Sequence, residues 1–357
     1  MFVSKLVLRN FRGYNYLSLE FQKGLNIIIG ENAQGKTNIV EAIHFLSLAK
    51  SFRTNENCDL ITKSRQFATI DAWVGQDNIT KEITALLTPS IKKVTCNKNP
   101  VRKISELSSL INVLLFEPKD TFLFSGSPIA RRNFIDVSIS KKSPIYLDNL
   151  IVYERLLKER NAILKRDTID KIQLEVITKR IVDASETIAN YRNVYINEIN
   201  RILSRIVAKL SNEKSDVILC YHPFVVPDKD YKKNTLKAYE KSLESDIKHK
   251  ATQIGIHRED ISMLLNGKDI ATHGSRGENR ICVLALKLAP YFLIDDKEAR
   301  PIVVLDDAMS ELDKAHQQSL LEFLSNFEQV FITTTHLEIK NASIYEVKEH
   351  TVTRRHA

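Results

Sequence analysis

The feature that most constrains the fold of this chain is a glycine-bearing loop at residues 30–37, with the sequence GENAQGKT. It follows a short apolar run at residues 24–29, and after it Ile39, Ile43 and Leu46 recur at helical spacing. The order strand, loop, helix puts the loop at a helix N-terminus, where backbone N–H groups and the helix dipole attract anions. Because the loop also matches G-x-x-x-x-G-K-[ST] at every fixed position, the sequence predicts a phosphate-binding loop in an α/β nucleotide-binding fold.

The polar groups of this loop have distinct expected roles. Lys36 is expected to reach the β- and γ-phosphates of ATP, and the hydroxyl of Thr37 to ligate Mg²⁺. The glycines let backbone N–H groups turn inward toward the phosphate oxygens. The residues expected to bind the nucleotide are Gly30, Asn32, Gly35, Lys36, Thr37 and Asn38.

A second element lies about 270 residues later, where the apolar strand of residues 302–305 is followed by Asp306 and Asp307. Such an ending is unusual because an unpaired buried charge is costly, and a metal ion would account for the two acids. We expect Asp306 to hold Mg²⁺ through water and Asp307 to orient or deprotonate the attacking water, with Lys36 as the third catalytic residue. A pair of capping residues in a surface turn is the alternative.

Residues 275–280 (SRGENR) open a helix about 25 residues before the acidic strand. They resemble the signature motif of ABC ATPases, whose serine and glycine bind the γ-phosphate held by the opposite subunit. The resemblance assigns Ser275 and Gly277 to the nucleotide site, although Glu278 and Asn279 stand where glutamine is more usual. A helix N-cap followed by a turn would explain the same residues.

Three smaller elements follow the order expected of an ABC ATPase. Residues 309–313 (MSELD) look like the D-loop that crosses the dimer interface. His336 stands where many ABC proteins have a switch histidine, although a histidine after a strand is more often an ordinary loop residue. No glutamine stands out as a Q-loop residue, and Glu117 occupies the place where one is expected, either as a substitute or as an exposed side chain.

The middle of the chain is helical in character. Residues 146–210 contain no glycine, and apolar residues spaced by three or four from Ile181 to Leu210 predict one amphipathic helix of about 30 residues. The fold class that we predict is therefore an α/β ABC-type P-loop ATPase head. Its nucleotide-binding lobe is split between residues 1–115 and 270–357, and a mainly helical second lobe comprises residues 116–269.

Composition excludes several other classes of protein. No run of about 18 apolar residues predicts a membrane span, and the N-terminus lacks the pattern of a signal peptide, so we expect an intracellular, cytoplasmic protein. The four cysteines lie far apart without a CxxC pair, which argues against a structural zinc site or a disulfide framework. The net charge of +8 is compatible with binding to a polyanion but does not decide the matter.

Taken together, these motifs resemble the RecF family of DNA repair and recombination proteins, and more loosely the heads of Rad50 and SMC proteins. The resemblance covers nearly the whole chain. It is carried by residues 8–14 (LRNFRGY), 30–38, 50–54 (KSFRT), 126–128 (GSP), 131–136 (RRNFID), 255–260 (GIHRED) and 306–313 (DDAMSELD). As in that family, the second acid is aspartate rather than glutamate.

The resemblance implies an ATP-dependent homodimer in which Ser275 of one subunit completes the site built on Lys36 of the other. It implies slow, DNA-dependent ATP hydrolysis that acts as a switch, and binding to double-stranded or gapped DNA, with single-stranded DNA also possible. RecR and RecO would be partners in loading RecA at gaps. The resemblance also implies a protein of the nucleoid without a membrane partner. Five basic residues of the shared motifs either lie near the nucleotide or DNA, or pair with acidic neighbours: Arg53, Arg131, Arg132, His257 and Arg258.

Three other interpretations share the main motifs. The nucleotide-binding subunit of a transporter usually has a compact helical lobe and lacks the N-F-R pattern of residues 10–12. A structural ATPase of the SMC or Rad50 kind needs hundreds of heptad residues. A DNA clamp in which ATP serves only as a switch overlaps with the favoured interpretation, because slow hydrolysis after dimerisation is what a switch requires.

Overall fold

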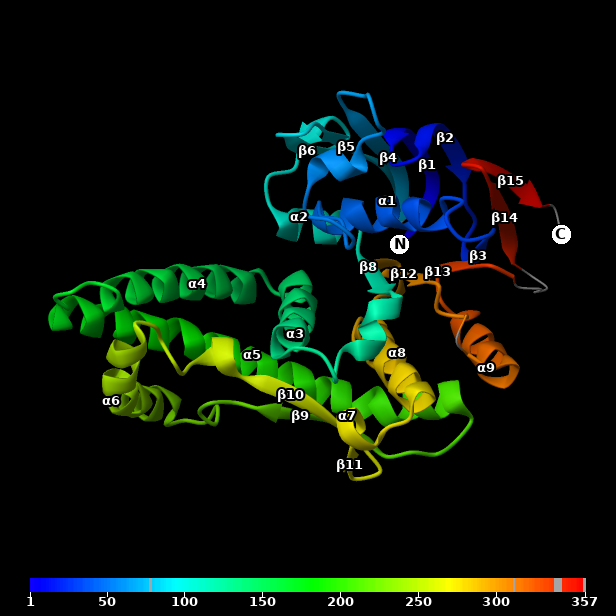
Figure 1. The fold of residues 1–357 in the computed structure, drawn as a ribbon. Coiled ribbons are helices and arrows are strands. Elements are labelled where there is room, and N and C mark those ends of the chain that lie inside the picture. Colours follow the sequence, from blue (N-terminus) through cyan, green and yellow to red (C-terminus); the bar gives the residue numbers. More distant parts are fainter. Residues whose placement is uncertain (77–78, 311, 337–341, 356–357) are drawn as a thin grey trace. The chain divides into compact units, whose positions relative to one another are not determined.

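The computed structural model of the chain describes residues 1–76, 79–310, 312–336 and 342–355. The chain divides into two compact units (Figure 1). Unit 1 contains residues 1–121, 205–214 and 276–357, and unit 2 contains residues 122–204 and 215–275. The segment 205–214 thus groups with unit 1, although it lies inside the stretch predicted as the helical lobe.

An antiparallel sheet forms one layer of unit 1, with the strand order β2-β1-β4-β5-β6-β7 in the described residues. Strand β4 shows why it forms, because Ala68, Ile70, Ala72 and Val74 alternate as buried residues along one face. Residues 68–76 form one continuous strand of this sheet. The strands are β1 (Phe2–Phe11), β2 (Tyr14–Glu20), β4 (Ala68–Gln76), β5 (Ile79–Leu87), β6 (Lys92–Cys96) and β7 (Asn99–Pro100).

The second sheet of unit 1 has the described order β15-β14-β3-β13-β12-β8, parallel except for β15. Because β3, β12 and β13 run in the same direction, their carboxyl ends meet at one edge, which is where open α/β sheets bind ligands. The strands are β3 (Gly24–Ile29), β8 (Val113–Phe116), β12 (Ile302–Asp306), β13 (Gln329–Thr334), β14 (Ser343–Lys348) and β15 (Thr351–Arg355).

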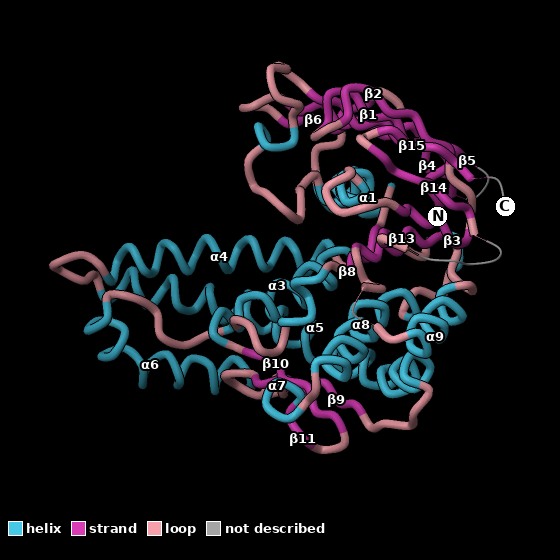
Figure 2. The backbone as a smooth tube through the Cα atoms, turned by 45° about the vertical axis from the view of Figure 1, so that its right-hand side comes forward, coloured by secondary structure: helices cyan, strands magenta, loops and turns pink. Residues whose placement is uncertain are grey.

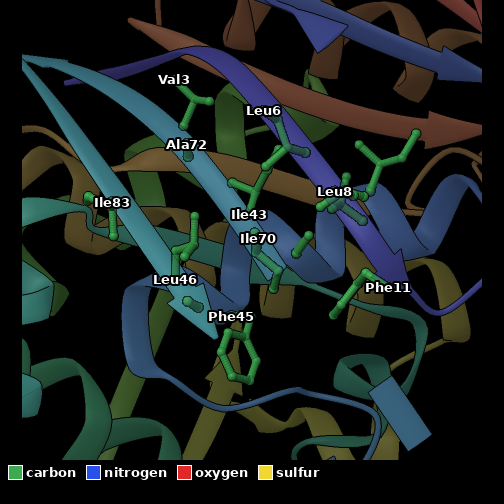
Figure 3. Packing of buried hydrophobic residues seen from close by; sticks show 14 of the residues in the cluster. Val3, Leu6, Leu8, Phe11, Ile43, Phe45, Leu46, Ile70, Ala72 and Ile83 are labelled. Carbon is green, nitrogen blue, oxygen red and sulfur yellow. The ribbon is translucent and has the colours of Figure 1, made fainter. Parts of the chain in front are cut away.

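Helix α1 (Lys36–Leu48) lies between the two sheets of unit 1 and contacts strands of both (Figure 2). Its apolar side chains are buried on nearly every side, so the helix lacks the polar face of a surface helix. Figure 3 shows Ile43 and Leu46 of α1 among Leu6, Ile70 and Ile83 of the antiparallel sheet. This core packs around α1 and so anchors the helix that follows the phosphate loop.

The remaining helices of unit 1 include the end of a helix that begins in unit 2. Asn212, just after that helix, donates from Nδ2 to the hydroxyl of Ser319 at 2.5 Å, and Lys209 lies over the ring of Phe323. These contacts explain why residues 205–214 group with unit 1. Its other helical elements are η1 (Asn57–Leu60), α2 (Ile104–Leu110), η2 (Pro118–Phe122), α8 (Arg276–Phe292), η4 (Lys297–Ala299) and α9 (Lys314–Leu324).

Unit 2 is mainly helical, and α4 and α5 run side by side in it (Figures 1 and 2). Helix α5 has 41 residues, more than the predicted 30 or so, because Leu174 and Ile177 continue its buried stripe before Ile181. A small antiparallel sheet has the described order β11-β10-β9. The elements are α3 (Pro128–Lys142), α4 (Pro144–Leu164), α5 (Lys171–Ser211), β9 (Val217–His222), α6 (Tyr231–His249), η3 (Ile256–Arg258), β10 (Asp260–Leu265), β11 (Lys268–Asp269) and α7 (Ile270–His273).

The basic residues of the 131–136 and 255–260 motifs mostly stabilise unit 2. Arg131 makes two 2.7 Å bonds to the carboxylate of Asp260, and Arg132 donates to the carbonyl of Glu259 at 2.7 Å. His257 lies 2.7 Å from the hydroxyl of Tyr153, and burial lowers the pKa of His257 to about 4, so its ring is neutral near pH 7. Arg258 is exposed instead.

Among the helices in the described ranges, none combines the length and the apolar character that crossing a membrane requires.

Candidate nucleotide-binding site

The phosphate loop joins the end of β3 at Ile29 to the start of α1 at Lys36. Gly35 has φ 109°, a left-handed conformation that residues with a Cβ rarely adopt. At Gly30, an added Cβ would stand well inside van der Waals contact of the carbonyl oxygen of Val347. Both glycines of the motif are therefore required by the backbone geometry.

Two other segments of unit 1 hold the loop from its outer side. The hydroxyl of Tyr14 donates to the carbonyl of Gly35 at 3.2 Å, and the N–H of His350 donates to the carbonyl of Gln34 at 3.3 Å. The N–H of Glu349 donates to Oε1 of Gln34 at 2.5 Å. Because these bonds engage carbonyl groups, they fix the loop without using the N–H groups that an anion would need.

Lys36 is a buried cation at the start of α1. Its Nζ donates to the carbonyl oxygens of Gly30 at 2.5 Å and Glu31 at 2.8 Å. Burial lowers the pKa of Lys36, whereas the charges of Asp307 and Asp306 oppose that shift. The ammonium group therefore lies across the loop and within electrostatic reach of both predicted catalytic acids.

Asp306 ends the buried strand β12 and joins the two main motifs. Its Oδ1 accepts hydrogen bonds from the hydroxyls of Thr37 at 3.0 Å and Thr333 at 2.6 Å. Burial raises the pKa of Asp306, and these two hydrogen bonds counteract the rise. The bond from Thr37 spans 269 residues of sequence, so the fold brings together the two elements that the sequence predicted as one site.

Thr333 is a residue of the site that the sequence did not reveal. It pairs with Asp306 in the parallel register of β12 and β13. Its hydroxyl donates to Asp306 and accepts from the N–H of Asp307 at 3.0 Å, so one side chain positions both acids. The only available signal was a polar residue at the end of a buried strand, and that signal has no meaning until the strand order is known.

Arg53, one of the five basic residues in question, lies beside the predicted site. Its Nη1 donates to Oδ1 of Asn38 at 3.0 Å and pairs with the buried carboxylate of Glu41 at 3.5 Å. The charge of Arg53 also lowers the pKa of Asp306, against the rise that burial causes. Arg53 thus does both: it pairs with an acidic neighbour and adds positive charge near the site.

The oxygen ligands present fit Mg²⁺. The described residues contain no cluster of three or more His, Cys, Asp or Glu side chains, but a nucleotide-bound Mg²⁺ needs only one or two protein ligands because phosphates and water supply the others. Thr37 Oγ1 and Asp306 Oδ1 lie 3.0 Å apart and bring together a hydroxyl and a carboxylate oxygen, the kinds of group that Mg²⁺ takes as ligands directly or through water. Thr37 and Asp306 are therefore the residues that could hold the ion.

The predicted signature residues lie at an exposed helix end. Helix α8 begins at Arg276, with Ser275 as the last residue of unit 2 and Gly277 in unit 1. Both Ser275 and Gly277 are exposed, and apart from the chain neighbours of Gly277 and the backbone of its own helix, no described atom lies within 4 Å of where a Cβ on Gly277 would stand. The N-terminal end of α8 is thus accessible to a second molecule.

The smaller predicted elements follow strands β8, β12 and β13 of the parallel sheet. In the predicted D-loop, Ser310 donates to the carbonyl of Asp307 at 3.1 Å and Asp313 caps α9, whereas Glu311 lies outside the described residues. Glu117 follows β8 and pairs with Lys119 at 2.9 Å, and burial raises the pKa of Glu117. His336 is exposed just after β13, and Asn32 is exposed on the phosphate loop.

Comparison with known proteins places this fold and site in a family. Residues 2–354 match the family described as the RecF/RecN/SMC N terminal domain. The DNA replication and repair protein RecF of Geobacillus kaustophilus is 35% identical over 369 residues, which cover 99% of each chain. The RecF protein of Bacillus subtilis is 34% identical over 364 residues, which cover 98% of each chain.

Solved structures agree with this assignment. The recombination mediator protein RecF of the RecFOR pathway, solved with ATPrS, has a TM-score of 0.89 at 29% identity and covers 99% of this chain and 98% of its own. An SMC head bound to the C-terminal winged-helix domain of ScpA has a TM-score of 0.60 at 16% identity, with 99% of this chain and 97% of its own covered, and shares only the fold. On the full-length match to RecF proteins, with the phosphate loop and acidic strand joined in one site, the chain belongs to the RecF family.

Proposed function

We propose that this chain serves in DNA replication and repair as an ATP-dependent switch on DNA. ATP would join two copies of the chain on double-stranded or gapped DNA, and slow hydrolysis would release them. The observation that carries the proposal is the hydrogen bond from Thr37 to Asp306, with Lys36 and Asp307 close by. It unites a phosphate-binding loop with the carboxylates that an ATPase of this class requires.

The identity of the nucleotide is supported by the RecF relatives. RecF proteins of the RecFOR pathway have been solved with ATP and with ATPrS, and both have TM-scores of 0.89 to this chain. The loop that binds phosphate in such folds is complete here at every fixed position. ATP is therefore the nucleotide that we assign to the site.

Each group of the site would have a distinct role in ATP hydrolysis. The loop N–H groups and the Lys36 ammonium would bind the β- and γ-phosphates, the ammonium exchanging the carbonyls of Gly30 and Glu31 for phosphate oxygens. Thr37 and Asp306 would hold Mg²⁺, which when bound supplies positive charge that stabilises the phosphates during transfer. Asp307 would orient the attacking water and accept its proton.

A second copy of the chain would complete the site. Ser275 and Gly277 lie at the exposed start of α8, and a helix N-terminus attracts a phosphate group because its N–H groups and dipole point outward. We assign these two residues to the γ-phosphate of the ATP bound by the partner. Each ATP would then lie between the loop of one subunit and the α8 of the other.

RecR, RecO and RecA are the partners that we assign to this chain, on the grounds of its family and of a relative in the RecFOR pathway. DNA binding would stimulate the slow ATPase. Contacts to DNA would go mostly to phosphates, since the net charge of +8 favours a polyanion and the motifs include no base-reading element.

The affinity for DNA with ATP or with ADP tests the proposed function. We expect duplex and gapped DNA to bind at least about tenfold more tightly with ATP, because a dimer engages about twice as many phosphates as a monomer. The logarithm of the affinity should fall linearly with that of the salt concentration and differ little between two unrelated sequences. Titrations of labelled DNA followed by fluorescence anisotropy measure both effects.

The Lys36→Met variant is the control for this titration, because it should lose the difference between ATP and ADP but keep its residual affinity. Equal affinity of the wild-type protein with ATP and ADP would contradict the proposed switch. A strong preference for one DNA sequence would contradict phosphate-based recognition.

A further inference from the structure

Arg280 makes a contact that the proposed mechanism has not used. It lies one turn into α8, three residues after Gly277, and only 2% of it is exposed. Its Nη2 donates to the carbonyl oxygens of Asp307 at 3.0 Å and Ala308 at 2.9 Å, and its guanidinium lies 5.8 Å from the ring centroid of Phe116. A buried arginine therefore binds the backbone that carries the proposed catalytic carboxylate.

The backbone of Asp307 needs such support. Its φ of 49° is left-handed, a conformation that sterics disfavour for a residue with a side chain. The N–H of Asp307 is held by Thr333, and its carbonyl accepts from both Arg280 and the hydroxyl of Ser310 at 3.1 Å. These hydrogen bonds fix the backbone of Asp307 on both sides of its Cα. Helix α8 as well as strand β13 therefore sets the direction of the Asp307 carboxylate.

Arg280 makes the strongest of these supporting hydrogen bonds. A hydrogen bond from a charged guanidinium is stronger than one from a neutral donor, and loss of the donor would leave two carbonyls in a largely buried place with fewer partners. The same helical turn carries Gly277 at its exposed end. Because the backbone of α8 is continuous between these residues, a change at the helix end is passed to Arg280 within one turn.

We propose that Arg280 is a positioning residue that couples the two ATP sites of a dimer. Binding of the partner's γ-phosphate at the start of α8 would shift that helix end, and Arg280 would set Asp307 of the same subunit for hydrolysis of its own ATP. This inference rests on the proposed function, because it needs a dimer whose sites are shared between subunits. Its consequence is that one site hydrolyses ATP efficiently only when the other site is occupied.

Steady-state hydrolysis by Arg280→Met, measured against ATP concentration, tests the coupling. Methionine keeps an unbranched apolar side chain at this buried position but removes the guanidinium and its donors. The wild-type rate should be sigmoidal in ATP concentration, with a Hill coefficient between 1 and its limit of about 2 for two sites. Arg280→Met should lower the Hill coefficient toward 1 and lower kcat by about 10- to 100-fold, because small misplacements of a catalytic group have effects of that size.

Two readouts separate coupling from a merely structural role. The ATP affinity of Arg280→Met should stay within about threefold of the wild type, and its ATP-induced dimer should still form, because the hydrogen bonds of Arg280 to Asp307 and Ala308 support the catalytic acid rather than the nucleotide. Arg280→Lys should recover part of both kcat and sigmoidality, since one ammonium can serve one of the two carbonyls. Arg180→Met, a change at an exposed arginine of α5, should behave as the wild type.

The inference is overturned if Arg280→Met keeps the wild-type kcat, or loses kcat while its curve stays as sigmoidal as that of the wild type. It is also overturned if ATP affinity and dimer formation fall in proportion to kcat, which would indicate a structural role. If Arg280→Met does not fold, as judged by its thermal unfolding curve, the same criteria apply to Arg280→Lys. A wild-type protein that stays monomeric with ATP would instead refute the proposed function.

Discussion

Asp307→Asn is expected to lower kcat for ATP hydrolysis by about 10²- to 10⁴-fold, the usual contribution of a positioned general base. ATP affinity should change by no more than a few fold, because Lys36 and the loop N–H groups would still bind the phosphates, and Thr37 and Asp306 would still hold the metal. The substitution keeps the shape of the side chain and the N–H bond to Thr333. Single-turnover hydrolysis and equilibrium binding of a fluorescent ATP analogue separate the two effects.

Asp295→Asn is the matched control, because Asp295 is an exposed aspartate near the start of β12 and lies outside the site. Its kcat should equal that of the wild type. Normal hydrolysis by Asp307→Asn would show that another group activates the water. Loss of ATP binding by the same variant would show that Asp307 acts on the nucleotide complex rather than on the reaction.

Lys36→Met should weaken ATP binding by about 100-fold, which corresponds to the ~3 kcal/mol of a hydrogen bond to a charged group. The ammonium of Lys36 is buried, and it has two acidic residues within electrostatic reach. Without it, the phosphates would face Asp306 and Asp307 with less positive charge between them. Isothermal titration with ATP and Mg²⁺ measures the loss.

Lys241→Met controls for the removal of a positive charge, because Lys241 is exposed on α6. It should bind ATP as the wild type does. The melting temperatures of both variants should lie within a few degrees of the wild type, since the hydrogen bonds of Lys36 within the described residues go to two carbonyls of its own loop. Retention of full ATP affinity by Lys36→Met would place the nucleotide elsewhere.

The parts of the site that the sequence predicted are those encoded by a continuous stretch. The loop at residues 30–37 and the acids after residues 302–305 are local patterns with a fixed relation to one strand or helix. Their meeting could be expected because both follow strands whose carboxyl ends face one edge of a parallel sheet. The hydrogen bond from Thr37 to Asp306 agrees with that expectation.

The parts that the sequence did not predict depend on strand order or on contacts between distant segments. Thr333 matters only because β13 pairs with β12. Tyr14, at the start of β2, and His350, in the turn between β14 and β15, support the phosphate loop from positions far apart along the chain. Arg280 looked like one more residue of the signature motif until its bonds to the backbone after β12 were known.

The motif residues of unit 2 show a second limit of prediction from the sequence. The patterns at residues 131–136 and 255–260 identified the family but could not separate a basic residue that binds a ligand from one that pairs with an acid. Arg131 makes two hydrogen bonds to the carboxylate of Asp260, and His257 is a neutral, largely buried side chain. Pairing of this kind depends on the packing of α3 against β10, which no local pattern encodes.

The central claim is that the chain holds half of each ATP site and that a second copy supplies the other half. Its most direct test is the molar mass of Asp307→Asn by light scattering with saturating ATP and Mg²⁺. The account predicts twice the 40.9 kDa of one chain with ATP and a single chain with ADP, and a single chain with ATP when Ser275→Arg is added. A mass of one chain for Asp307→Asn with ATP bound would contradict the shared site.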